Sequence, residues 1–136
     1  MIFSTVDDFY LNSQDVIFSP SVKDDISPST EGKLRHYGCH IICESCKGLG
    51  LPQTVACTAQ VLLHRYYYKE SLKRYDVNIM AVSMFWLACK LEEVIDVDDP
   101  NKIRLRDVLV MFYHVTRRVR YGIPDGGLLD IFSFVG

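Results

Sequence analysis

The sequence contains no apolar stretch long enough to cross a lipid bilayer. Its most hydrophobic segment, Val77–Leu91, is interrupted by Asn78 and Ser83 and falls short of the roughly 20 residues that a membrane-spanning helix needs. The N-terminus has neither the basic region nor the apolar core of a signal peptide. The net charge is only −2, so no overall field attracts nucleic acid or an anionic membrane. We therefore expect no membrane partner.

The signatures of common enzyme classes are also missing. There is no P-loop, no G-x-G-x-x-G and no G-x-S-x-G. Glu92 and Glu93 are adjacent carboxylates, but neighbouring residues on a helix point about 100° apart and cannot flank one scissile bond. We expect no catalytic residue, no cofactor and no small-molecule ligand.

The five cysteines do not form the even-numbered framework of a secreted disulfide-rich domain. Four of them lie in apolar helical patterns, which favours reduced thiols in the core of an intracellular protein: Cys39, Cys43, Cys57 and Cys89. The spacing Cys39-x3-Cys43-x2-Cys46 also matches the iron–sulfur ligands of radical enzymes. Because these cysteines belong to a regular helical pattern, the cluster is the minor alternative.

A single-helix zinc site is a second minor alternative. His36, His40 and Cys43 are spaced at i, i+4 and i+7, and His64 or His114 would have to supply the fourth ligand from another helix. Two histidines on the polar face of a helix need no such explanation, so a solvated face is the preferred interpretation.

Residues 1–29 are acidic and contain two Ser-Pro pairs, at Ser19 and Ser27. This composition predicts an extended N-terminal arm, with one helical turn near Val6–Tyr10. Ser-Pro pairs are candidate phosphorylation sites, although turn initiation is the simpler explanation.

Residues 30–136 form the predicted domain, and their apolar periodicity is helical throughout. The pattern predicts helices over residues 30–47, 52–68, 76–93 and 103–118. The third is the most hydrophobic and is expected at the centre of the bundle. No segment shows strand alternation flanked by hairpin turns, so the predicted fold class is all-α.

Lys90 fits the third helix poorly, because it ends an apolar segment and is followed directly by Glu92 and Glu93. A lysine is costly to bury unless it is paired. The helix macrodipole favours a cation in the last turn by about 0.5 kcal/mol. The pattern leaves two possibilities open: the side chain extends into solvent, or it is held in place to meet a partner.

A loose cluster of basic residues near the C-terminal end is a second candidate surface. Arg104, Arg106 and Arg117 share one face of the fourth helix, and Arg118 and Arg120 follow. Such a face could contact phosphates. A solvated helix face is the simpler interpretation, since the arm and residues 96–100 are acidic.

Three segments taken together resemble a known family: GCHIICESCKGLGLPQTVACTAQVLLHRYYY, VNIMAVSMFWLACKLEE and IRLRDVLVMFYHV. They are similar to the first cyclin box, most closely that of the L-type transcriptional cyclins and next that of the K type. The likeness runs from about Leu34 to Val115, and DDFYL at 7–11 is similar to the arm before the box. Its more specific motifs are the Leu-Pro-Gln start of the second helix, His64-Arg65 before aromatics, LACKLEE at 87–93 and Arg106-Asp107-Val108.

The resemblance implies a cyclin-box bundle of five helices, with the third central and the last incomplete in this chain. It implies a regulatory subunit of a transcriptional cyclin-dependent kinase, without catalysis of its own. Such a subunit pushes the kinase C-helix inward and orders the activation loop. The implied setting is nuclear, in transcription or pre-mRNA splicing.

The family also assigns roles within the motif L-A-x-K-x-E-E. Its lysine donates hydrogen bonds to backbone carbonyls of the kinase, which gives that role to Lys90. Leu87, Leu91 and Glu93 match neighbouring contact positions.

The chain departs from the family pattern in three respects. No match is found for the helix-5 glutamate that pairs with the lysine, and residues 94–102 form a longer and more acidic link. A second cyclin box and an Arg-Ser-rich tail are absent, so we expect a partial chain. The alternative function is a cyclin-like module, as in transcription factor IIB, that binds nucleic acid or the promoter complex through the Arg104–Arg120 face without activating a kinase.

Overall fold

The computed structural model describes residues 17–95, 98–99 and 102–121. This part of the chain contains no strand, and the all-α prediction is confirmed. Each of the four predicted helices begins and ends within a few residues of its expected limits. The elements are α3 (Pro20–Lys23), α4 (Pro28–Gly48), α5 (Gln53–Tyr66), α6 (Val77–Leu91) and α7 (Leu105–Tyr121).

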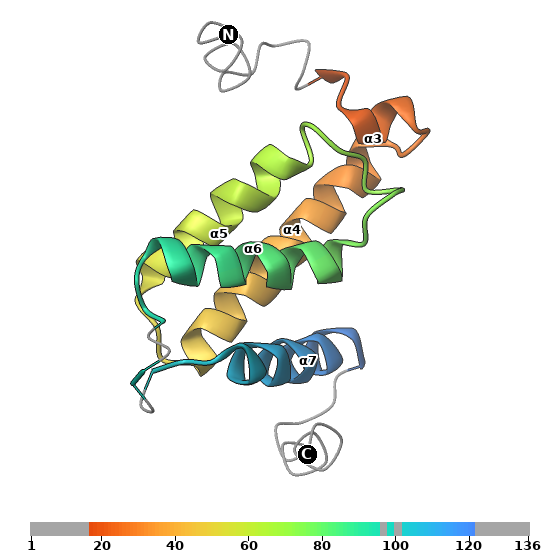
Figure 1. Cartoon of the computed structure of the whole chain (residues 1–136). Helices are drawn as coiled ribbons and strands as arrows, with labels where there is room; N and C mark the ends of the chain where they lie inside the picture. The colour runs from red at the N-terminus through yellow and green to blue at the C-terminus, as the bar shows by residue number, and fades with distance from the viewer. Residues whose placement is uncertain (1–16, 96–97, 100–101, 122–136) are drawn as a thin grey trace, which may run out of the picture.

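The long helices form a bundle in which α4 and α5 run antiparallel and α6 crosses both (Figure 1). α7 runs back alongside α6 and also packs on α4. The core is made of fully buried aliphatic and aromatic side chains, among them Ile41, Leu63, Phe85 and Val108. The rings of Phe85 and Phe112 lie 5.2 Å apart and join α6 to α7. Burial of this apolar surface is the main driving force for folding.

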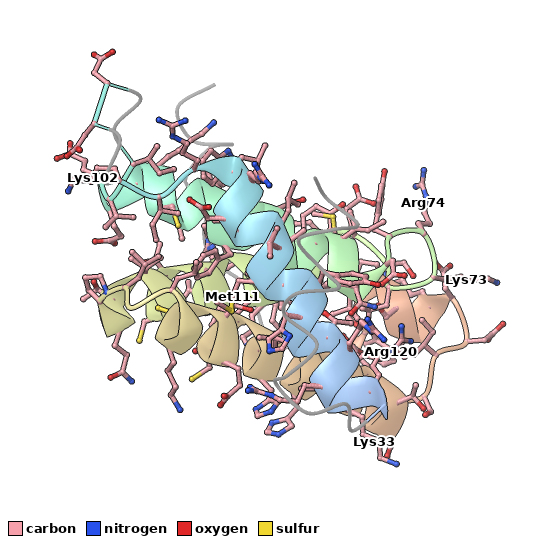
Figure 2. The ribbon with its side chains drawn as sticks, turned by 90° about the horizontal axis from the view of Figure 1, so that it is seen from below. Lys33, Lys73, Arg74, Lys102, Met111 and Arg120 are labelled. Atoms are coloured by element: carbon pink, nitrogen blue, oxygen red, sulfur yellow. The ribbon has the colours of Figure 1, made fainter. Side chains whose placement is uncertain are left out.

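Two glycines of α4 mark where other helices approach its backbone. A Cβ on Gly38 would lie 2.7 Å from Leu63 Cδ2 and 2.9 Å from Val77 Cγ2. Because α5 and α6 both press on this point, Gly38 has no room for a side chain. At the end of α4, the atoms nearest to a Cβ on Gly48 would be those of the flexible Met111 side chain of α7, which Figure 2 labels.

The expectation that the third helix is central is met by its contacts, since α6 packs against α4, α5 and α7. Val77, Ala81, Phe85, Ala88 and Cys89 are buried there. However, α6 also keeps one apolar side in solvent, and α4 is the helix that touches every other described helix.

The described part of the predicted arm is not extended. Residues 20–23 form α3, and both its N-cap Ser19 and its second residue Ser21 are fully buried. The difference has a local cause, because Ser19 caps α3 and its hydroxyl donates to Glu31 Oε2 at 2.8 Å. The boundary between an N-terminal arm (1–29) and the cyclin-box domain (30–136) stays a prediction. The expected helical turn at Val6–Tyr10 and the incomplete last helix lie outside the described residues.

Candidate functional site

The C-terminal end of α6 is fixed by a compact backbone cap. Val94 N–H donates to Cys89 O at 3.1 Å, and Glu93 N–H donates to Lys90 O at 3.2 Å. This is the Schellman arrangement, in which the residue after the helix has a positive φ. Here that residue is Glu93, with φ 57°. The chain therefore turns sharply away, and the side of the last turn that carries Leu87, Lys90 and Leu91 stays exposed.

The four predicted contact residues lie together at this end of the helix. Leu87 is 42% exposed and Leu91 is 59% exposed, although both are large apolar side chains. Lys90 and Glu93 are exposed as well. Leu87, Lys90 and Leu91 fall within one side of the helix, because i, i+3 and i+4 positions are neighbours. Their role in binding a partner stays a prediction.

Lys90 reaches solvent with its ammonium over an aromatic ring. Its Nζ lies 5.6 Å from the centroid of the Trp86 ring, one turn earlier on α6. Of the two possibilities left open by the sequence, the structure shows an exposed side chain that is restrained by an aromatic neighbour. The expectation that this chain has no match for the helix-5 glutamate, which the family pairs with the lysine, stays a prediction.

Glu92 belongs to the same end but faces α5. Its Oε1 accepts a hydrogen bond of 2.8 Å from the hydroxyl of Thr58. The bond ties the C-terminal end of α6 to α5.

A buried polar network, which sequence reasoning missed, joins the N-terminal segment to α4 and α5. Glu31 Oε1 accepts from Arg35 Nε at 3.1 Å and from Arg35 Nη2 at 3.0 Å, and both side chains are about nine-tenths buried. Arg35 Nη1 donates to His64 O at 3.0 Å, and the guanidinium lies over the Tyr68 ring at 4.2 Å. The available signal was the i, i+4 spacing of Glu31 and Arg35. Nothing local indicated that the pair is buried.

His64 is held neutral by this network. Arg35 Nη1 lies 3.1 Å from His64 Nδ1, and because arginine only donates, Nδ1 must accept. The ring proton is then on Nε2, which lies 3.2 Å from Cys39 Sγ. Burial, and then the nearby Arg35 charge, hold the pKa of His64 below its ordinary value. Burial also raises the pKa of the Cys39 thiol.

The cysteines are free, but they are not all core residues. Cys46 and Cys89 are buried, and burial raises the pKa of Cys89 to about 12. Cys57 was expected in the core and is exposed, because the side of α5 that carries Cys57 and Val61 faces solvent. That expectation was wrong.

The residues of the zinc alternative are not assembled. His36 and His40 are exposed on α4, whereas His64 is bound to Arg35 and Cys39. Across the described ranges, no three His, Cys, Asp or Glu side chains are placed to hold a metal ion. Nor does any helix there have the length and hydrophobicity to cross a membrane.

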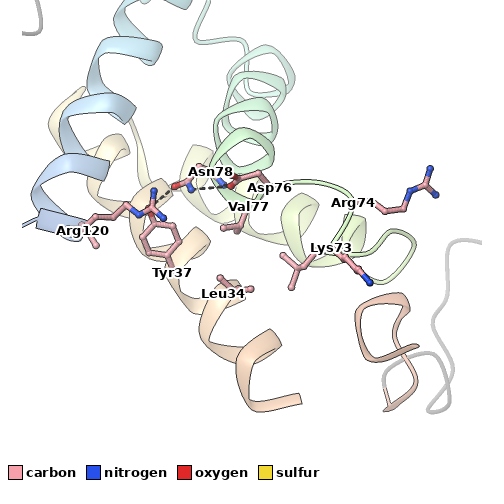
Figure 3. Close-up of a pocket in the computed structure, with 10 residues that line it drawn as sticks. Leu34, Tyr37, Lys73, Arg74, Asp76, Val77, Asn78 and Arg120 are labelled. Carbon is pink, nitrogen blue, oxygen red and sulfur yellow. Dashed lines mark hydrogen bonds between the residues drawn. The ribbon is translucent and has the colours of Figure 1, made fainter. Parts of the chain in front are cut away.

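An open hollow of about 770 Å³ lies at the opposite end of α6 (Figure 3). It is bordered by α4, the start of α6 and the end of α7. Three of its polar residues are bound to one another: Tyr37 donates to Asn78 Oδ1 at 2.6 Å, and Asp76 caps α6 by accepting from Asn78 N–H at 2.8 Å. Arg120 points toward this pair (Figure 3).

Basic residues also lie outside the Arg104–Arg120 face of the nucleic-acid alternative. Lys102 lies at one end of the molecule, and Lys33, Lys73, Arg74 and Arg120 lie at the other (Figure 2). On α7 itself, Arg118 donates to Glu44 Oε2 at 3.1 Å and Arg117 lies over Tyr113. Arg104 and Arg106 are exposed near its start. Binding of phosphates by this face stays a prediction.

Comparison with known proteins identifies relatives over most of the chain. The family model of the cyclin N-terminal domain matches residues 5–111. The chain is 44% identical over 124 residues to Cyclin-L1-1 of Arabidopsis thaliana, covering 91% of this chain and 28% of that protein. It is 43% identical over 133 residues to Cyclin-L1-1 of Oryza sativa subsp. japonica, covering 98% and 29%.

A human relative is more distant. Identity to Cyclin-L1 of Homo sapiens is 32% over 126 residues, covering 93% of this chain and 23% of that protein. The chain thus spans less than a third of the length of these three relatives.

Proposed function

This chain belongs to the cyclin family as an L-type member, and from that premise we propose that it binds and activates a cyclin-dependent kinase of the transcriptional type. Its role is regulatory and not enzymatic. The proposal extends to a nuclear setting in transcription or pre-mRNA splicing. The proposal is supported by the similarity of this chain to relatives that are named as L-type cyclins.

One structural observation carries the proposal. An exposed lysine stands between two exposed leucines on a helix end that is otherwise part of the core. Water-exposed Leu87 and Leu91 gain free energy when a partner covers them. Lys90 brings three N–H donors, which suit carbonyl oxygens at the end of a partner helix or loop. Two exposed leucines with a cation beside them can supply such a contact with both apolar area and directional hydrogen bonds.

The rigid connection of this surface to the bundle suits activation. Ala88 and Cys89, next to the exposed side, are fully buried, and Thr58 holds Glu92. Pressure from a partner on Leu87 and Lys90 is therefore borne by α5 and by the core, not by a mobile loop. A regulatory subunit that pushes a kinase helix inward needs such a firm support.

Replacement of Lys90 tests the proposal. We expect Lys90→Ala to weaken capture of a purified cyclin-dependent kinase by at least about fivefold, because the carbonyl acceptors of the kinase lose their donor. Its circular dichroism and unfolding midpoint should match those of the original chain, since the side chain is exposed.

The control is Lys33→Ala, which removes another exposed lysine at the far end of α4 (Figure 2). It should leave capture unchanged. Equal capture by folded Lys90→Ala and by the original chain would refute the assignment. Equal losses in both variants would indicate a nonspecific charge effect.

A further inference from the structure

Binding of a partner through Lys90 carries an entropic cost, because the flexible lysine side chain must be held in one conformation. A free lysine side chain loses substantial rotamer entropy when a partner immobilises it. A second group that already restricts the side chain lowers this penalty. Among the described residues no carboxylate pairs with Lys90, and its ammonium contact is the Trp86 ring at 5.6 Å.

Trp86 is well suited to restrict Lys90. It lies four residues earlier on α6, so the two side chains are neighbours on the helix surface. Its ring is half-buried and packs against the hydrophobic core. One part of the indole is therefore fixed by the core, while its accessible face meets the ammonium. Trp86 is also the sole tryptophan of the chain.

The chemistry of an indole differs from that of a carboxylate in a way that matters here. A carboxylate would accept hydrogen bonds from the ammonium and compete with carbonyl oxygens of a partner. An indole face attracts the charge through its quadrupole and leaves the three N–H donors available. The attraction increases when a partner excludes water from the contact.

We infer that Trp86 is a positioning residue for Lys90, and that the Trp86–Lys90 pair forms one anchor for backbone carbonyls of a kinase. The inference rests on the proposed function, which it deepens by adding a residue outside the L-A-x-K-x-E-E motif. Trp86 contributes through the placement of the ammonium.

The first test is a double-mutant cycle with purified cyclin-dependent kinase. We expect Trp86→Leu to weaken binding about two- to thirtyfold, the range that spans exposed and desolvated cation–π contacts. Trp86→Phe keeps an aromatic face and should recover most of the affinity. In a Lys90→Met background, Trp86→Leu should have little further effect, because the cation that it positions is gone.

Tyr113 and Arg117 of α7 provide a matched control. They form a second aromatic–cation pair with the same i, i+4 spacing and the same distance of 5.6 Å. Tyr113→Leu and Arg117→Met should leave kinase affinity unchanged. A comparable loss in this control cycle would show that the effect at Trp86 is general and would overturn the inference.

A second readout needs no partner. In the original chain, the ε-methylene protons of Lys90 should be shifted upfield by the indole ring current. The shift should vanish in Trp86→Leu and persist in part in Trp86→Phe. Absence of the upfield shift in the original chain would overturn the inference even if kinase binds.

The two hypotheses fail differently. If Lys90→Met does not weaken kinase binding, the proposed function fails and the inference fails with it. If Lys90→Met weakens binding but Trp86→Leu has no effect, or adds its effect independently of Lys90, only the inference is overturned.

Discussion

At the scale of single residues, Glu93 shows how the candidate surface is shaped by an unfavourable backbone angle. Its φ of 57° lies in the left-handed region, which costs a residue with a Cβ about 1 kcal/mol relative to glycine. The same device ends α3, where Asp25 has φ 66°. At both positions an acidic residue stands where glycine is usual.

Glu93→Gly should therefore stabilise the protein by up to about 1 kcal/mol, since relief of strain outweighs the added freedom of the unfolded chain. Urea unfolding measures the change. Glu93→Ala keeps the strain and should bring no such gain. If both variants are equally stable, the positive φ is not a source of strain.

Lys90 and Trp86 illustrate which features of the candidate surface can be predicted from the sequence and which cannot. The exposure of Lys90 is one of the two possibilities that the sequence pattern left open for a cation in the last turn of a helix. The contact with Trp86 depends on side-chain rotamers. The Arg35–His64 contact is even harder to predict from the sequence, because the two residues come from different helices and no local spacing relates them.

At the scale of elements, the four long helices were predictable because each carries a sustained apolar period. α3 was not, because a helix of one turn has almost no stability of its own. It is held by contacts far away in sequence: Ser21 Oγ accepts from Leu72 N–H at 2.9 Å, across 51 positions. A composition rich in Ser, Pro and Asp gives no hint of such a bond.

Ser21→Ala should loosen α3 and the link between α5 and α6 together. The substitution leaves the buried Leu72 N–H without its acceptor, at a cost of about 1–3 kcal/mol. Hydrogen exchange of the Leu72 amide should be at least about fivefold faster. Ser29→Ala, at an exposed position on α4, should not change it. Unchanged exchange at Leu72 in Ser21→Ala would mean that α3 is held by other contacts.

At the scale of the whole molecule, stability should depend on pH through His64. Burial, and then Arg35, lower its pKa in the folded state, so the unfolded chain binds a proton more readily. Stability from the neutral ring is therefore complete above the unfolded pKa of about 6.5, and is lost as the pH falls below it. Glu31, Arg35 and Cys39 are the titratable or charged groups of this network.

The measurement is urea unfolding between about pH 8 and pH 5, a range that brackets the ordinary histidine pKa. The loss from one such group is at most about 1.4 kcal/mol per pH unit. His64→Gln should flatten the profile over this range. His36→Gln, at an exposed site, should leave it unchanged. A profile unaffected by His64→Gln would exclude this group as the source.

Gly38 and Gly48 of α4 have a consequence for how the family can vary. Gly38 is enclosed by Leu63 and Val77, two buried and branched side chains, whereas the nearest atoms to a Cβ at Gly48 belong to the flexible side chain of Met111. We therefore expect positions 38 and 48 of the same helix to differ in their tolerance to substitution. Position 38 tolerates no larger residue unless α5 and α6 retreat together, while position 48 can change whenever a methionine across from it bends aside.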